Sequence, residues 1–408
     1  MAELGFPMID ADNHYYEVDD AFTRYLDPAF ADRACHIRRA DPARPGKVYI
    51  GESKVDYWSA NPSDATGEPG ALLEYMKHSK RPGATTGNAV TYGGVVDARD
   101  RPDFQDRSAR LATMDAQGVE AAIMLPSTEI GVEWDLQRDP AVLAANLTAF
   151  NRWLEDDWGY GTDGRLFGVP MLNLSELAYA TAELERVVSA GARIVHLKPG
   201  PVQGADGVSR SPADPYFDPF WARCAEAGVA VAFHLVHYGY TELYSTLWSE
   251  KGSLPHNHFS PLQRVTCMAE RVMGDTLCAL VTHNLFGRFP QLVVATIENG
   301  SEWVAPLLKK MDRAARMCGP TDWPFGDIGE RPSNVFKRHV KVNPYPEEDH
   351  VSLARAIGAE NVLGGSDFPH PEGLAEPTDL VHQLDGLADD EVRMILRDNT
   401  AALLGLGR

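Results

Sequence analysis

The stretch Val229-Ala230-Val231-Ala232-Phe233-His234 is the clearest indication of how this chain folds. It is a short, continuous apolar run rich in β-branched residues, which is typical of a strand covered on both faces in a parallel sheet. Similar runs recur along the chain. Counted with this one, the predicted strands cover residues 8–12, 119–125, 166–172, 192–197, 229–234, 292–298, 339–342 and 362–367.

Helical periodicity fills the spaces between these runs. It is clearest in residues 108–117, 140–158, 175–190, 218–227 and 263–286. Eight β-α units in a chain of 408 residues favour an α/β fold, a (β/α)₈ TIM-like barrel that spans residues 1–408 as a single domain. The alternative that this pattern leaves open is a doubly wound, open parallel sheet.

Three irregular segments interrupt the alternation of strands and helices. Residues 28–106, between the first and second strands, contain many Pro, Gly and charged residues. Residues 237–262, which follow the fifth strand, are rich in aromatic side chains, and residues 317–337 are also irregular. In a barrel the segments after strands 1 and 5 lie at the C-terminal mouth, where loops build the active site. We therefore expect insertions at the mouth that act as lids or subunit contacts, with residues 28–106 as the largest.

The composition excludes several classes of partner. The chain has 38 Lys and Arg against 58 Asp and Glu, which gives a formal charge of -20. Such a surface repels nucleic-acid phosphates and anionic lipid, so we expect neither partner. No apolar run reaches the roughly 18 residues of a membrane helix, and the first residues lack the features of a secretory signal. The five scattered cysteines indicate reduced thiols in a cytoplasmic protein.

Carboxylate and imidazole side chains stand at the ends of four predicted strands. They are Asp10, Asp12 and His14 after the first strand, His234 after the fifth, Glu298 after the sixth and Asp367 after the eighth. Each of them alone is equally consistent with a helix cap or a core histidine. In a barrel, however, the four strand ends converge, and a buried cluster of charges is costly without a cation. The pattern therefore predicts a divalent metal site and a small-molecule substrate.

Five stretches of the chain carry a resemblance to a known family. They are IDADNH (9–14), AFHL (232–235), LFGRFPQLVVATIENGSEWV (285–304), VLGGSDFPHPEG (362–373) and LADDEVRMILRDNTAALLGL (387–406). These stretches resemble the amidohydrolase-related family of the metal-dependent hydrolase superfamily, which includes aminocarboxymuconate-semialdehyde decarboxylase and aromatic acid decarboxylases. The resemblance extends over the whole chain except residues 28–106 and implies a barrel with a divalent ion at its mouth.

The resemblance also implies a role for individual residues. The family's first-strand ligand pair corresponds to Asp12 and His14, its fifth-strand histidine to His234, and its eighth-strand aspartate to Asp367. In this superfamily that aspartate touches the metal and takes a proton from metal-bound water. The sequence does not distinguish Zn, Mn and Fe, or one ion from two.

Glu298 departs from the family pattern. The decarboxylases carry a histidine at this position as an acid/base group, so their mechanism does not transfer directly. A carboxylate also bridges two metals better than an imidazole, and Asp10, His237 and His370 are nearby candidates for a second ion or for supporting contacts. The Glu-bearing branch resembles the part of the family that includes non-haem di-metal oxygenases.

These observations rank the possible functions. Hydrolysis by metal-bound hydroxide, with Asp367 as general base and Glu298 as acid or second-metal ligand, is the leading hypothesis. Metal-dependent decarboxylation, a di-iron monooxygenase and a non-catalytic assembly subunit are the alternatives. Lys198, His256 and His258 are candidates for substrate contacts, although each also suits a solvated rim or loop. From family analogy we expect a homodimer.

Overall fold

The computed structural model describes residues 4–42, 44–78 and 94–407, and most of its strands are parallel. Two ladders of parallel strands form the wall of a barrel, in the orders β1-β7-β8 and β15-β14-β13-β10-β9. Their bounds are β1 Met8–His14, β7 Val119–Leu125, β8 Leu166–Gly168, β9 Met171–Leu172, β10 Ile194–Leu197, β13 Ala230–His234, β14 Val294–Ile297 and β15 Val340–Val342. The predicted α/β barrel is confirmed.

The eighth predicted strand, residues 362–367, forms no ladder. Val362 makes an isolated bridge to Val342 of β15, and Phe368 makes another to Asn13 of β1. Between them, Ala11 N donates to Gly364 O at 2.9 Å, while Gly364 N donates to Ile395 O at 2.9 Å in the C-terminal segment. Because its backbone is divided between β1, β15 and the C-terminal segment, this stretch closes the barrel without continuous pairing.

The prediction of one strand over residues 166–172 is also wrong in detail. The strand is interrupted between β8 and β9, where Pro170 has no N–H to donate to a neighbour. Its carbonyl still accepts from His196 N at 2.9 Å. The interruption explains why the barrel wall is divided into two ladders.

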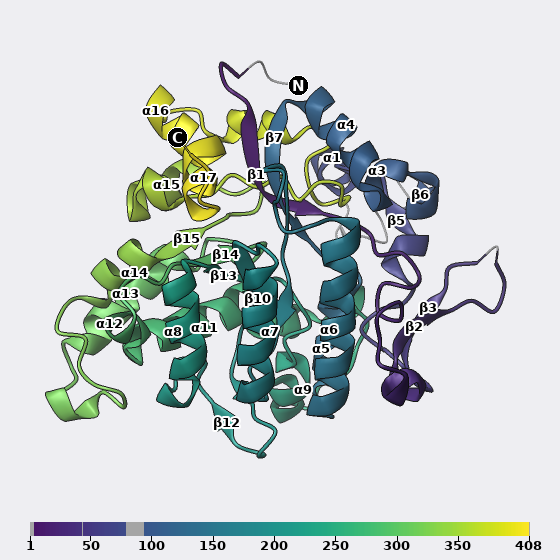
Figure 1. The fold of residues 1–408 in the computed structure, drawn as a ribbon. Coiled ribbons are helices and arrows are strands. Elements are labelled where there is room, and N and C mark those ends of the chain that lie inside the picture. Colours follow the sequence, from purple (N-terminus) through teal and green to yellow (C-terminus); the bar gives the residue numbers. More distant parts are fainter. Residues whose placement is uncertain (1–3, 43, 79–93, 408) are drawn as a thin grey trace.

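Helices cover the outside of the barrel, and Figure 1 shows α6, α7 and α8 along one flank of it. Their bounds are α4 Arg107–Gln117, α6 Pro140–Asp157, α7 Leu177–Ser189, α8 Asp218–Ala227, α10 Pro261–Thr266, α11 Ala269–Thr282, α12 Leu285–Arg288, α13 Val304–Ala315, α14 Pro332–His339, α15 His350–Ile357, α16 Asp389–Arg393 and α17 Asn399–Leu403. The single helix predicted over 263–286 is three helices: Met268 is extended, with a ψ of 178°, between α10 and α11, and Asn284 adopts a left-handed φ of 54° between α11 and α12. None of the helices in the described ranges is long and apolar enough to span a membrane.

The predicted insertion, residues 28–106, contains short elements of its own. They are the antiparallel strands β2 Cys35–Arg38, β3 Lys47–Ile50 and β4 Ser53–Lys54, the pair β5 Thr66–Gly67 and β6 Val95–Val96, and the helices α1 Ala71–His78 and α3 Pro102–Gln105. The segment joins the barrel where α1 begins: Leu72 N donates to Pro371 O at 2.7 Å. The other loops carry α5 Glu133–Leu136, α9 Tyr240–Leu243 and the hairpin β11 Val202–Gln203 with β12 Ser209–Arg210.

Small and branched side chains fill the interior of the barrel. The cluster includes Ile9, Ala11, Ala121, Ile123, Leu125, Ile194, Ala230, Ala232, Ala295, Ile297 and Leu363. Because this layer is apolar and buried, water cannot reach the polar groups at the strand ends through the interior of the barrel. The five cysteines form no disulfide among themselves in this structure.

Candidate metal centre and active site

The end of β1 separates two carboxylates that strict alternation would place together. The register between β1 and β7 shifts between Asp10 and Asn13. Asp10 accepts hydrogen bonds from Ser366 N at 2.9 Å, from Ser366 Oγ at 2.5 Å and from Asn13 Nδ2 at 3.0 Å. Its carboxylate therefore holds the barrel-closing segment, which is a supporting contact, and Asp10 belongs to neither ligand group found among the described residues.

Four buried side chains from three strands form the first ligand group: Asp12, His14, His234 and Glu298. Each offers one ligand atom, and these atoms all lie within 4.8 Å of one another. His14 Nε2 is 3.1 Å from Asp12 Oδ1 and 3.6 Å from Glu298 Oε2. His234 Nε2 is 2.9 Å from Glu298 Oε2. The donor set is two imidazoles and two carboxylates, which suits Zn, Mn or Fe.

A second ligand group overlaps the first. It consists of His14, Glu298, Asp367 and His370, again with ligand atoms within 4.8 Å of one another. His14 Nε2 is 3.3 Å from Asp367 Oδ1, and His370 Nδ1 is 2.8 Å from the same oxygen. The two groups share His14 and Glu298, so the six side chains form one continuous centre.

Two of these ligand residues sit on unusual backbone. Glu298 has a φ of 52° and Asp367 a φ of 59°, both in the left-handed region. A residue other than glycine pays of order 1 kcal/mol or more to adopt this conformation, and such residues concentrate at functional sites. Glu298 directly follows β14 and Asp367 lies in the barrel-closing segment, and both carboxylates belong to the ligand groups.

The ring nitrogens of His14 and His234 have lone pairs available for a cation. His14 Nδ1 lies 3.2 Å from Pro126 O, and because a carbonyl only accepts, Nδ1 carries the proton and leaves the lone pair of Nε2 facing the carboxylates. In the described part of the chain, His234 Nδ1 is buried without a hydrogen-bond partner, and His234 Nε2 and Glu298 Oε2 lie 2.9 Å apart without forming a hydrogen bond with each other or with any other group. Buried polar atoms without partners are rare, so these residues fit a metal ion.

Burial dominates the electrostatics of the centre. It raises the pKa of Glu298 to about 8. Burial and the nearby Glu298 also raise the pKa values of Asp12 and Asp367 well above the usual range. Burial lowers the pKa of His14 well below its ordinary value and that of His234 to about 4. A bound divalent cation would lower the pKa values of the carboxylates again, because it stabilises their ionised form.

A short chain of hydrogen bonds leads away from Asp367. Ser127 Oγ donates to Tyr15 O at 2.8 Å, so its oxygen is left to accept from His370 Nε2 at 2.9 Å. His370 Nδ1 then faces Asp367 Oδ1 without a proton of its own. One proton is therefore shared between Asp367 and His370.

A small cavity of about 110 Å³ opens beside the second ligand group. It is lined by Tyr16, Trp58, Pro62, Ala65, Thr66, Ser127, Ile130, Leu235, His256, Glu298, His370, Pro371 and Glu372. Trp58, Pro62, Ala65 and Thr66 belong to the predicted insertion, and His256 belongs to the aromatic loop after β13. The loops after the first and fifth strands thus reach the site, as expected for a barrel mouth.

The remaining predicted site residues occupy different positions. His256 lines the cavity, and its Nδ1 lies 2.7 Å from Tyr57 Oη, whereas His258 is exposed. His237 bonds to Glu242 at 3.1 Å and stacks on Tyr57, so it belongs to neither ligand group. Lys198 does not line this cavity; its Nζ lies 5.6 Å from the centre of the Trp134 ring.

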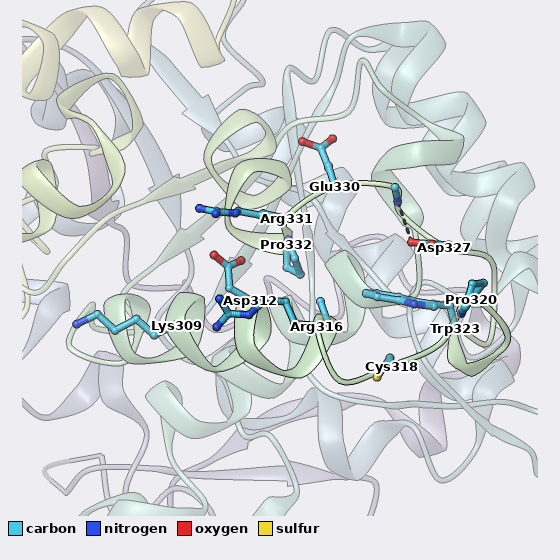
Figure 2. A pocket seen from close by; sticks show the side chains of 12 residues that line it. Lys309, Asp312, Arg316, Cys318, Pro320, Trp323, Asp327, Glu330, Arg331 and Pro332 are labelled. Carbon is cyan, nitrogen blue, oxygen red and sulfur yellow. Dashed lines mark hydrogen bonds between the residues drawn. The ribbon is translucent and has the colours of Figure 1, made fainter.

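A larger hollow of about 660 Å³ lies elsewhere on the barrel (Figure 2). It is formed by the end of α13, the start of α14 and the loop that joins them, and Lys309, Arg316 and Arg331 are among its lining residues. None of its lining residues belongs to either ligand group. Size alone therefore does not identify the active site, and the ligand groups at the strand ends do.

The comparisons with known proteins agree with this architecture. A family model described as "Amidohydrolase" matches residues 9–406. The chain belongs to the amidohydrolase family. An amidohydrolase from Mycobacterium avium subsp. paratuberculosis is 35% identical, with a TM-score of 0.87 over 99% of this chain and 100% of that chain.

Solved structures of lower sequence identity share the fold of the present chain. The 2,6-dihydroxybenzoate decarboxylase from Rhizobium is 16% identical, with a TM-score of 0.62 over 98% of this chain and 99% of that chain. A 5-carboxyvanillate decarboxylase from Novosphingobium aromaticivorans, solved with bound manganese, is 15% identical, with a TM-score of 0.61 over 98% of both chains. No curated protein matches the chain.

Several residues around the candidate metal centre of the present chain were not identified from its sequence. Ser127 and Asn343 follow the second and seventh strands, and polar residues at those strand ends were an available signal. With its amide turned to satisfy both neighbours, Asn343 donates to Asp12 Oδ2 at 3.1 Å and accepts from Gly365 N at 3.0 Å. Trp58 and Glu372 lie in loops, where the sequence has no periodicity to indicate direction.

Proposed function

We propose that this protein is a metal-dependent hydrolase that acts on a small organic substrate. The observation that carries the proposal is the first ligand group, in which four buried side chains from three strands place their ligand atoms within 4.8 Å. Asp12, Glu298 and the adjacent Asp367 are three carboxylates in one buried centre, and such a cluster is costly without a cation. We propose Asp12, His14, His234, Glu298 and Asp367 as the metal ligands.

The residues of the centre divide the chemical work. A bound divalent ion supplies Lewis-acid activation and makes hydroxide available from water near neutral pH. With an ion bound, Asp367 would be ionised and would accept a proton from water as general base, and His370 Nδ1, 2.8 Å from its Oδ1, would receive that proton. Ser127 orients His370 through the bond to Nε2. Glu298 would hold the ion through its ionised carboxylate, and the proton that His370 has received would be returned to the leaving group.

The loops give the reaction a sheltered space. Trp58 from the insertion and His256 from the loop after β13 line the cavity beside Glu298. We propose that the insertion, residues 28–106, serves as a lid within a single-domain barrel. Excluding water strengthens the electrostatic interactions between the site and its substrate.

The test of this proposal is turnover of the metal-loaded enzyme on a panel of amides, esters and lactones. Release of acid that depends on added metal and is lost in Asp367→Asn supports hydrolysis. Metal-dependent release of CO₂ from aromatic acids, with no turnover on the panel, would instead favour a decarboxylase, the activity for which the distant structural neighbours are named.

A second candidate function is a dinuclear monooxygenase. The observation that favours it is the sharing of Glu298 between two ligand groups, since a carboxylate can bridge two ions. In that case His370 is a ligand and not a proton acceptor. Two irons per chain with consumption of O₂ and a reductant would support this alternative over hydrolysis.

We also propose that the protein forms a homodimer through the loop that follows β13. Leu247 and Trp248 in this loop are 76% and 59% exposed. Exposed large apolar side chains that lie close together are typical of interaction sites.

A further inference from the structure

Glu372 lies in a rigid turn beside the candidate metal centre. His370 N donates to Asp367 O at 2.9 Å, and Leu374 N donates to Ser366 O at 2.8 Å across the turn. A Cβ at Gly373 would lie 2.4 Å from Asp367 O, so the backbone is packed too closely for a side chain there. This packing leaves no room for a side chain at Gly373, and the neighbouring Glu372 lines the cavity.

The carboxylate of Glu372 has an unused hydrogen-bond acceptor. Its Oε2 atom is buried and has no hydrogen-bond partner among the described residues. A buried acceptor that stays unpaired costs about 1–3 kcal/mol, and more when it is charged. Glu372 lines the cavity beside the second ligand group, so a bound substrate can supply the missing partner.

The charge of the cavity disfavours an anionic substrate. Its lining contains the carboxylates Glu298 and Glu372, and none of its described lining residues is a Lys or an Arg. A single divalent ion and the proton shared by Asp367 and His370 together offset at most the three negative charges on Asp12, Glu298 and Asp367, which leaves Glu372 uncompensated. The buried Arg110 is engaged elsewhere, donating to His14 O at 2.6 Å and to Asn13 Oδ1.

The walls of the cavity suit a flat apolar body. Trp58 Nε1 donates a hydrogen bond to Thr128 O at 2.9 Å, and Tyr16 Oη lies 2.6 Å from Thr66 Oγ1. The polar atoms of both rings are therefore occupied, and what the rings offer the cavity is apolar surface. Ile130 and Leu235 extend this surface.

From these contacts we propose that Glu372 determines specificity by accepting a hydrogen bond from an N–H or O–H group of a neutral or cationic substrate. The substrate class is a small, flat, apolar molecule that carries an amide, amidine or amine and not a carboxylate. This inference rests on the proposed function with one divalent ion. It restricts the substrates of the proposed hydrolysis to molecules of this class.

The experiment compares three probes of matching shape and different charge: benzamidine, benzamide and benzoate. Their affinities are measured by calorimetry on the manganese-loaded enzyme. Benzamidine and benzamide are expected to bind at least about tenfold more tightly than benzoate, because a buried, charge-assisted hydrogen bond is worth about 1.5–3 kcal/mol. Benzoate binding more tightly than both would overturn the proposal and favour a centre with two ions.

A pair of variants tests the residue itself. Glu372→Gln is expected to weaken benzamidine about tenfold and to leave benzamide closer to its original affinity, since the amide still accepts a hydrogen bond. Glu226→Gln, an exposed residue on α8, makes the same change of charge away from the cavity and is expected to alter neither. Unchanged benzamidine affinity in Glu372→Gln would contradict the assignment. If the variant does not fold, the order of the three affinities on the unaltered enzyme still tests the proposal.

The metal-free protein separates this inference from the proposed function. If the chain binds no divalent metal yet still prefers benzamidine and loses that preference in Glu372→Gln, the hydrolase proposal fails and the role of Glu372 stands. If metal binds with the expected ligands and benzoate is preferred, the role of Glu372 fails alone.

Discussion

Replacing Glu298 with Gln should change how the stability of the metal-free protein depends on pH. Burial raises the pKa of Glu298 from 4.5 to about 8 in the folded chain. Between these pH values the folded chain holds a proton that the unfolded chain has released. The contribution of Glu298 to the free energy of unfolding therefore falls as pH rises, by about 1.4 kcal/mol per pH unit for one proton.

The magnitude at neutral pH follows from the same two pKa values. With 4.5 in the unfolded chain and about 8 in the folded chain, the cost at pH 7 is on the order of 3 kcal/mol. Gln does not ionise, so the metal-free variant should gain stability relative to the original protein as pH rises. The amide is a poorer ligand than the carboxylate, so the variant should also gain less from added metal.

The assay is urea denaturation of both metal-free proteins across about pH 5 to 8, where Glu298 titrates. The difference between the two proteins reports the titration of Glu298 together with its coupling to Asp12 and Asp367. Its removal also lowers the pKa values of Asp12 and Asp367, an effect of the same sign. Glu302→Gln, at an exposed neighbouring position, is the control. Parallel pH profiles for Glu298→Gln and the original protein would refute the reasoning.

Three further predictions test the surrounding residues and the assembly. Ser127→Ala should retain the metal but lower kcat about tenfold and shift the pH–rate profile, because His370 loses its orienting contact; an unchanged profile would argue against the proton path. Trp58→Ala should raise KM about tenfold with metal content unaltered, since it removes apolar contact from the cavity; an unchanged KM would show that the insertion does not cover the substrate. Light scattering at micromolar concentration should give a dimer that Trp248→Glu dissociates, and a monomeric original protein would contradict the loop interface.

The sequence predicted the fold well wherever a local pattern determines it. The apolar run that ends in His234 is β13, and the helix over residues 218–227 is α8 with identical bounds. The predictions failed where non-local contacts decide: residues 362–367 divide their hydrogen bonds among three partners, and Pro170 interrupts a run that is otherwise strand-like.

The convergence of the candidate ligands could be predicted for the same reason, while their role stays a prediction. Asp12, His14, His234 and Glu298 follow from strand ends that must converge in a barrel. The separation of Asp10 from Asp12 did not follow, because it depends on a register shift between β1 and β7 that alternation does not reveal. Glu372 and Trp58 could not be placed, since turns and loops are positioned by the packing of distant segments.

The most direct test of the central claim is the metal content of the chain after purification without chelators. Elemental analysis should find at least one divalent metal ion per chain, and the ion should be lost in His234→Ala and in Asp12→Asn. One ion per chain agrees with the proposed hydrolase, and two irons would favour the oxygenase. A folded chain that carries no stoichiometric metal and gains no stability from added Zn, Mn or Fe would contradict the account.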